Sequence, residues 1–113
     1  MLDAGCGSGI DAVHMASENG SQVVALELSD PGIRQTQARG RMMSNLVPVR
    51  GDLEALAFRD QSFDFVYSYG VLHHLVHPER GFQELVRVLK PGGLIAIYVY
   101  EDFDTRTRLE RML

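Results

Sequence analysis

The chain has 113 residues and a formal net charge of −4 at pH 7; 45% of its residues are hydrophobic and 23% are charged. This length predicts one domain, residues 1–113, that buries roughly two thirds of its unfolded surface, and it is short for a complete α/β enzyme. No apolar run approaches the ~20 residues of a membrane helix, and the acidic balance gives no electrostatic footprint for phosphate backbones. We therefore predict a cytoplasmic protein that binds neither nucleic acid nor a membrane.

The chain opens with a short apolar strand, residues 1–4, that runs into a loop with glycine at Gly5, Gly7 and Gly9. A helical segment over residues 10–19 follows, and a glycine ends it. Glycine has no Cβ and tolerates positive φ, so such a loop brings its amides close to a bound molecule and to the next helix N-terminus. The opening therefore predicts a site for a nucleotide-like cofactor.

The loop begins like the dinucleotide fingerprint G-x-G-x-x-G. In that fingerprint the third glycine permits close helix-to-strand packing beside the pyrophosphate, and Ile10 occupies the corresponding place here. A branched side chain there argues against a pyrophosphate site. The better description is G-x-G-x-G preceded by Asp3, and an NAD-dependent oxidoreductase half-domain is the less favoured alternative.

A second strand, residues 22–28, leads into a second helix. This helix is expected to begin near Pro31, because Ser29 or Asp30 can cap it and proline suits the first helical turn. Gly40 is expected to lie inside the helix and to weaken it.

Two further strands, residues 47–50 and 63–69, are joined by an irregular connection that starts with Gly51. Short β-like runs that alternate with helical stretches are typical of a parallel sheet with crossover helices. The sequence therefore predicts an α/β fold.

A third helix is expected from Pro78 to Leu89, with apolar residues at the i, i+3, i+4 and i+7 spacing of one buried face. Residues 90–93 should end it, since a cation meets the helix end and proline and glycine cannot continue it. The last strand, residues 94–100, is apolar without alternation, as expected for a parallel strand covered on both faces. Residues 101–113 are expected to open another helix.

Polar residues stand at the ends of these strands: Glu27 in the second, Asp52 after the third, and Ser68 and Tyr69 in the fourth. In open parallel sheets, ligands bind at the carboxyl ends of the strands, where the strand order reverses. Glu27 lies 20 positions after Gly7, close to the spacing at which an acidic residue meets ribose hydroxyls.

A carboxylate such as Glu27 can accept hydrogen bonds from both hydroxyls of a diol; the alternative is a strand-end carboxylate in water. Asp52 could accept from an adenine amino group while Leu53 packs on the ring. For Asp52 the alternative is a turn residue that bonds to its own backbone.

Four ordered motifs accompany the glycine loop, at residues 24–29, 51–66, 70–75 and 84–93. Together they resemble the motifs of small-molecule class I S-adenosylmethionine-dependent methyltransferases, and the resemblance covers almost the whole chain. It implies a Rossmann-like, doubly wound sheet of five mainly parallel strands in order 3-2-1-4-5. The family's N-terminal helices and strands six and seven are lacking, so the chain is expected to be truncated at both ends.

The resemblance implies S-adenosyl-L-methionine as the cofactor, with the methionine end near the glycine loop, the ribose at Glu27 and the adenine at Asp52 and Leu53. Many relatives have Asp at the place of Glu27, and the change keeps the carboxylate. The implied cofactor-binding residues are Asp3, Gly5, Cys6, Gly7, Gly9, Glu27, Leu28, Asp52, Leu53, Ser68, Tyr69 and Gly70. The last three would line the cleft in which the methyl group moves.

The implied reaction is methyl transfer to a small-molecule acceptor. Most of the catalysis can come from alignment of the acceptor with the S–CH₃ bond, so no catalytic residue is assigned. If the acceptor carries a proton, His73 or His74 is the nearest group to take it; the alternative is that one histidine packs under the sheet edge and the other is solvated.

No metal site is predicted, because no Cys or acidic ligand follows His73, His74 and His77 at zinc-site spacing. Cys6, the single cysteine, excludes an internal disulfide and is interpreted as a small loop residue. Because the missing parts would cap the cofactor, we expect weak S-adenosylmethionine binding and a weakly active or non-functional fragment. The alternative is a non-catalytic Rossmann-like module or pseudoenzyme. The oligomeric state is not readable, although the apolar edge at residues 94–100 is available for association.

Overall fold

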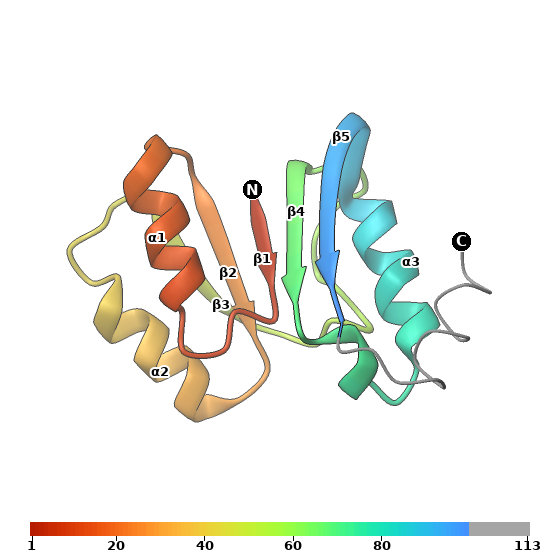
Figure 1. The fold of residues 1–113 in the computed structure, drawn as a ribbon, viewed down its shortest axis with the longest axis horizontal. Helices are drawn as coiled ribbons and strands as arrows, with labels where there is room; N and C mark the ends of the chain where they lie inside the picture. The colour runs from red at the N-terminus through yellow and green to blue at the C-terminus, as the bar shows by residue number, and fades with distance from the viewer. Residues whose placement is uncertain (100–113) are drawn as a thin grey trace.

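The structure, a computed structural model, describes residues 1–99 as one open sheet with helices on its two faces (Figure 1). The strands are β1 (Leu2–Ala4), β2 (Val23–Glu27), β3 (Leu46–Arg50), β4 (Phe63–Tyr69) and β5 (Leu89–Tyr98). The helices are α1 (Ile10–Asn19), α2 (Asp30–Arg39), α3 (Pro78–Val88) and the short 3₁₀ turn η1 (Leu72–His74). None of the helices described is both long and apolar enough to cross a membrane.

The strands pair in parallel in the order β3-β2-β1-β4-β5, which confirms the predicted α/β fold and strand order. The chain runs outward from β1 to β3 and then returns to β4 on the other side of β1. The strand order therefore reverses between β1 and β4, and the crevice of an open α/β sheet lies at such a point. Although β1 has only three residues, Leu2 pairs with Val24 on one side and Val66 on the other.

Alternating side chains of the central strands build a separate core on each face of the sheet. One core lies under α3 and contains Leu2, Leu26, Val66, Leu85 and Val88. The other lies under α1 and α2 and contains Ala12, Ala16, Val23, Ala25 and Leu46. Small alanines on α1 bring that helix close to the sheet, and Leu2 and Ala4 hold β1 in the core under α3.

Helix α2 begins as its capping residues predict but ends earlier than expected. Ser29 is the N-cap, and its hydroxyl accepts a hydrogen bond from the backbone N–H of Gly32 at 3.2 Å. The expectation that Gly40 lies inside the helix is wrong. Gly40 is the C-cap, and its N–H donates to the carbonyl of Thr36 at 3.0 Å. Glycine is required at this position because Leu46 packs so closely that a side chain would not fit.

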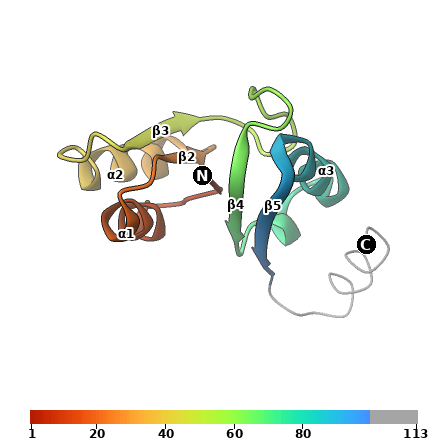
Figure 2. The same cartoon turned by 90° about the horizontal axis from the view of Figure 1, so that it is seen from above.

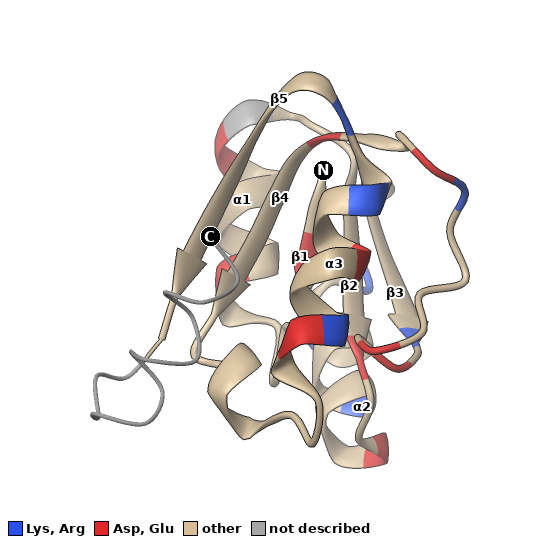
Figure 3. Cartoon of the chain, turned by 90° about the vertical axis from the view of Figure 1, so that its right-hand side faces the viewer, with Lys and Arg blue, Asp and Glu red and all other residues tan. Residues whose placement is uncertain are grey.

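The boundary between α3 and β5 also differs from the prediction. The helix ends at Val88, and Leu89 already pairs with Phe63 of β4. Residues 90–93 were expected to be only a helix stop, but they belong to the strand. Pro91, Gly92 and Gly93 instead lie where the pairing of β5 with β4 shifts register, between the pairs Phe63–Leu89 and Phe65–Leu94. Acidic and basic residues alternate along α3, in the order Glu79, Arg80, Glu84 and Arg87 (Figure 3).

Strand β5 is not covered on both faces, which corrects the interpretation of its apolar run. Helix α3 packs on one face, whereas α1 and α2 cover the half of the sheet formed by β1 to β3 (Figures 1 and 2). On the other face of β5, Leu94 keeps 70% and Tyr98 47% of its surface exposed. The expected strand end at Tyr100 and the helix expected at 101–113 lie outside the described residues.

Candidate functional site

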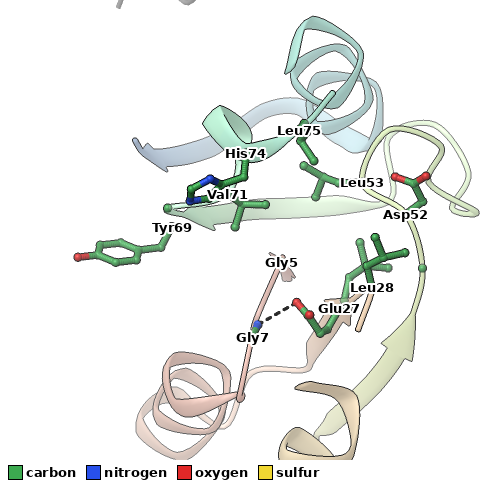
Figure 4. A pocket seen from close by; sticks show the side chains of 13 residues that line it. Gly5, Gly7, Glu27, Leu28, Asp52, Leu53, Tyr69, Val71, His74 and Leu75 are labelled. Carbon is green, nitrogen blue, oxygen red and sulfur yellow. Dashed lines mark hydrogen bonds between the residues drawn. The ribbon is translucent and has the colours of Figure 1, made fainter. Parts of the chain in front are cut away.

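Two adjoining pockets open at the carboxyl ends of the central strands. The main pocket, about 450 Å³, lies between the glycine loop, the ends of β2 and β3, and the turn after β4 (Figure 4). The side pocket, about 350 Å³, lies between the glycine loop, the first turn of α1 and β4. Gly5, Gly7 and Tyr69 line both pockets, so one elongated ligand could occupy the two together.

The structure brings most of the predicted site residues into these two pockets. Lining the main pocket are Gly5, Gly7, Glu27, Leu28, Asp52, Leu53, Tyr69 and Gly70. Asp3 and Cys6 line the side pocket. Segments that are far apart in the sequence therefore converge at one edge of the sheet.

Gly9 and Ser68 line neither pocket. A Cβ on Gly9 would stand 2.6 Å from Oγ1 of Thr36, so the absence of a side chain there lets α1 approach α2. Ser68 is fully buried within the sheet, because it points to the face opposite Tyr67 and Tyr69. The alternation of side chains along β4 therefore keeps Ser68 out of the cleft.

The glycine loop is anchored on β2 and presents Gly7 to the pockets. The backbone N–H groups of Gly5 and Cys6 both donate to the carbonyl of Leu26, at 2.9 and 2.8 Å. Gly7 has a φ of +57°, and a Cβ built on it meets no heavy atom within 4 Å. A glycine with positive φ therefore leaves open space where a ligand could lie against backbone.

Glu27 is held against this loop by three hydrogen bonds. Its Oε1 accepts from the N–H of Gly7 at 3.1 Å (Figure 4). Its Oε2 accepts from the N–H and the hydroxyl of Ser29 at 3.1 and 2.6 Å. A carboxylate has about four lone-pair positions. One lone-pair position of Glu27 therefore remains to accept a hydrogen bond from a ligand hydroxyl. A second hydrogen bond from the ligand to Glu27 requires the donor of Gly7 or of Ser29 to move away.

Asp52 and its apolar neighbours form the other end of the main pocket. Oδ1 of Asp52 accepts from the N–H of Glu54 at 2.9 Å, which is the turn interaction considered as the alternative. Within the described residues no hydrogen bond uses Oδ2. Leu28, 61% exposed, and Leu53 flank the same space. A flat ring with a polar edge fits walls of this kind.

Asp3 is a buried acid of the site, and its pKa is strongly raised. It is only 2% exposed, and its Oδ2 has no hydrogen-bond partner within residues 1–99. Burial, and secondarily the charges of Asp11 and Glu27, raise the pKa of Asp3 to about 7. The carboxyl therefore needs a cationic or donor partner when it is ionised.

Cys6 has the environment of a packed thiol. Its Sγ lies 3.5 Å from Oγ1 of Thr36, and burial raises the pKa of the thiol to about 11. A thiol that stays protonated at neutral pH is a poor nucleophile. This agrees with the interpretation of Cys6 as a small loop residue.

Sequence reasoning missed several lining residues. Asp11 and Tyr67 line the side pocket, and Val71 and Leu75 line the main pocket, as does His74, which the sequence suggested only as a possible proton acceptor. Tyr67 could have been found from strand alternation, because it lies two residues before Tyr69 on the same face. His74 faces the pocket, whereas the ring nitrogens of its neighbour His73 are buried.

The charges around the two pockets have one sign. Their lining residues include the carboxyl groups of Asp3, Asp11, Glu27 and Asp52 and no Lys or Arg. A pyrophosphate would meet only repulsion from such side chains, whereas a cationic nucleoside would be attracted. With the strand order and the glycine loop, this gives a Rossmann-like domain whose cleft lacks the features of a dinucleotide site.

Comparison with known proteins identifies the family. Residues 2–97 match the family described as "Methyltransferase domain", and the chain belongs to that family. Squalene methyltransferase 1 from Botryococcus braunii is 31% identical over 91% of this chain and 29% of its own length. Sterol 24-C-methyltransferase from Pneumocystis carinii is 34% identical over 87% of this chain and 27% of its own.

The solved structure of the [4+2]-cyclase SpnF superposes with a TM-score of 0.80 at 31% identity, over 85% of this chain and 36% of SpnF. The chain thus spans less than a third of the length of the two curated relatives and about a third of SpnF. The family match over residues 2–97 confirms the resemblance to class I methyltransferases stated from the motifs.

Proposed function

We propose that the protein binds S-adenosyl-L-methionine across the two pockets and transfers its methyl group to a small molecule. The observation that carries the proposal is the position of Glu27, which faces the glycine loop in the pocket that also contains Asp52 and Leu53 (Figure 4). In this assignment Glu27 binds the ribose, Asp52 and Leu53 bind the adenine, and Asp3 with the glycine loop binds the methionine end.

The bound cofactor would supply an activated methyl group on a sulfonium. What the protein must provide is alignment of the acceptor and exclusion of competing nucleophiles. Tyr69 lines both pockets and Gly70 lines the main pocket, next to the expected position of the sulfur. For an acceptor that loses a proton, His74 lines the pocket and could take it.

The names of the relatives support a small-molecule acceptor, because they refer to squalene and to sterols. The acceptor of this chain, its cytoplasmic location and the organisation of residues 1–113 as one partial domain remain predictions. Localisation can be tested by fractionation of cells that express the tagged natural gene.

The proposal is tested by calorimetry of the purified chain with S-adenosylhomocysteine and, separately, with NAD. We expect S-adenosylhomocysteine to bind with a dissociation constant above the micromolar range and NAD not to bind. Glu27→Gln should weaken binding of S-adenosylhomocysteine roughly 10- to 100-fold, the worth of hydrogen bonds to a charged group.

The matched control is Glu18→Gln, at an exposed carboxylate on α1, which should change nothing. Binding of NAD in preference to S-adenosylhomocysteine would favour the oxidoreductase alternative. Absence of binding by either ligand would favour a non-catalytic module.

A further inference from the structure

We propose that the last segment of this chain, residues 100–113, packs as an amphipathic helix onto the face of β4 and β5 opposite α3. We call this surface the open face. It consists of three register pairs of the two strands: Phe65–Leu94, Tyr67–Ala96 and Tyr69–Tyr98. The inference concerns the covering of the sheet and is independent of the proposed function.

The open face is apolar and largely uncovered by the described residues. Leu94 keeps 70%, Tyr69 48% and Tyr98 47% of its surface exposed. Figures 1 and 2 show α3 on the opposite face of β4 and β5, and α1 and α2 over the other half of the sheet. Parallel sheets are buried on both faces in almost all α/β proteins, and contiguous exposed apolar patches mark places where another segment binds. A cover for the open face is therefore expected.

Helix α1 borders the open face and gives it the shape of a groove. The hydroxyl of Tyr67 donates to Oδ2 of Asp11 at 3.1 Å, which ties α1 to β4 at one end. At the other end, Met15 of α1 and Phe65 of β4 line a hollow of about 730 Å³. A second helix can lie in such a groove, because packed helices have their axes 8–10 Å apart, roughly one helix diameter.

The segment leaves the sheet at the open face and is long enough to cover it. Tyr98 ends β5, and residues 100–113 follow one residue later. A loop of about four residues leaves roughly nine residues for a helix, which spans about 13 Å. From Tyr98 back to Leu94 the strand also covers about 13 Å. A helix that runs back along β5 therefore matches the exposed length.

The sequence of the segment gives such a helix an apolar side. Leu109, Met112 and Leu113 stand at i, i+3 and i+4, so a helix presents them on one face. The same spacing on α3 accompanies a face that is buried against the sheet. Since the open face offers the exposed apolar surface nearest to the end of β5, these three side chains have a place to be buried.

The charges of the segment complement those of α1. Asp11 and Glu18 lie seven positions apart on α1 and share one side of that helix with Met15. Residues 105–113 contain three arginines and one glutamate. A helix placed between α1 and β5 brings these arginines towards the carboxylates of α1, whereas the outer surface of α3 already pairs its own charges, Arg87 with Glu84.

The first experiment is disulfide trapping in the full chain. In Leu94→Cys/Met112→Cys, mild oxidation should join the two cysteines within one molecule, because a helix that runs back along β5 brings Met112 near Leu94. In the matched control, Val86→Cys/Met112→Cys, the first cysteine stands at a 49% exposed position of α3, and no bond should form. Mass spectrometry shows whether a bond lies within one chain or between two.

The second experiment is thermal melting of Leu94→Asp, Leu109→Asp and the double variant. Each single substitution should lower the melting temperature by about 4 to 8 °C, as loss of an apolar contact does in a domain of this size. The double variant should melt close to the lower of the two, because one substitution already releases the segment. Val86→Asp, the control, should shift the melting temperature by less than about 2 °C.

Three outcomes would overturn the inference. A disulfide between two chains would mean that a second copy covers the open face. A disulfide in Val86→Cys/Met112→Cys and none in Leu94→Cys/Met112→Cys would place the segment against α3. An unchanged melting temperature of Leu94→Asp would show that nothing covers Leu94. None of these results bears on binding of an adenosyl ligand, so the proposed function stands or falls separately.

Discussion

Asp3 couples the chemistry of the site to the stability of the chain. Its pKa is about 7 in the folded protein against 3.8 for an ordinary aspartate. Between these two pH values the folded state binds a proton that the unfolded chain has released. The free energy of unfolding therefore falls as the pH rises from about 4 to 7.

The resulting prediction concerns Asp3→Asn, which cannot ionise. The variant should be more stable than the wild type at pH 8, by a few kcal/mol at most, since each pKa unit is worth about 1.4 kcal/mol. The difference should shrink towards pH 4. Urea unfolding of both proteins at pH 4.5 and 8 measures it, and a difference independent of pH would contradict the assignment of the raised pKa.

Gly32 shows how a residue outside the pockets controls a residue inside them. A Cβ at this position would stand 2.7 Å from Cγ of Glu27 and 2.8 Å from the carbonyl oxygen of Gly7. Gly32 lies near the start of α2, where its N–H also bonds to the hydroxyl of Ser29. The first turn of α2 therefore packs directly on the ribose end of the proposed site.

We expect Gly32→Ala to displace Glu27 and to weaken binding of S-adenosylhomocysteine about tenfold, the cost of a misplaced charge-assisted hydrogen bond. The melting temperature should also fall, because the contact with the carbonyl oxygen of Gly7 forces the backbone to shift, which outweighs the helix preference of alanine. Gln37→Ala, at an exposed position of the same helix, is the control. Unchanged affinity in Gly32→Ala would show that Glu27 does not need its present position.

At the residue scale, the sequence predicted those residues of the site that stand at the carboxyl ends of strands. Glu27 and Asp52 were placed correctly in one pocket because parallel strands end at a common edge. Ser68 was placed in the cleft although the strand period directs it into the core. Asp11 was missed because its contact with Tyr67 joins residues 56 positions apart, which no local pattern reports, whereas strand alternation from Tyr69 could have indicated Tyr67.

At the scale of elements, Arg87 ties α3 to the connection between β3 and β4. Its guanidinium donates to the carbonyl oxygens of Leu56 and Phe58, at 3.0 and 2.8 Å, and to the carboxylates of Asp60 and Glu84. Leu53, which lines the main pocket, lies on the same connection. The planar fork of arginine serves these several acceptors at once.

Arg87→Lys keeps the charge but not the fork, and we expect a lower melting temperature because the two carbonyls lose their donor. Binding of S-adenosylhomocysteine should weaken less than it does in Glu27→Gln, since only the position of Leu53 is affected. Arg80→Lys, at an exposed position of α3, is the control. Equal melting temperatures of the two variants would refute the bridging role of Arg87.

Most elements were predictable because local signals define them. The limits of α1 and β4 were predicted to the residue, since glycines and charged turns bound them. The end of α3 was not, because apolar spacing continues through Leu89 while pairing with Phe63 draws this residue into β5. A helix and a strand that follow each other without a loop leave no turn signal to read.

At the scale of the molecule, the negative charge of the cleft matches the negative net charge of the chain. S-adenosylmethionine carries one more positive charge than S-adenosylhomocysteine. Four carboxyl groups line the two pockets, and no Lys or Arg is among the lining residues, so the cofactor should be preferred over the uncharged-sulfur product. Under the proposed function, such a preference would assist product release.

We predict that S-adenosylmethionine binds several-fold more tightly than S-adenosylhomocysteine at low salt, and that the ratio falls towards one as sodium chloride rises from about 0.05 to 0.5 M, because the Debye length shortens. Calorimetry of both ligands along this series measures the ratio. A ratio that does not respond to salt would assign the preference to contacts other than charge.

The fold as a whole was predictable from the alternation of strands and helices, because each βαβ unit must cross over with one hand. The exposure of β5 could not be read from its apolar composition, since coverage depends on which helices pack on each face. The relatives are more than three times longer than the matched region. The acceptor pocket therefore cannot be derived from these residues alone.

The hydrogen bond from Gly7 to Glu27 has a practical consequence. A ribose that engages the Glu27 carboxylate must share or replace this bond, so the Gly7 amide proton is a natural sensor of occupancy. Its resonance in a nitrogen–proton correlation spectrum, and its rate of exchange with deuterium, should change when the ribose arrives and stay constant when a ligand reaches only the adenine end. The chain thus carries a label-free probe for screening nucleoside fragments one moiety at a time.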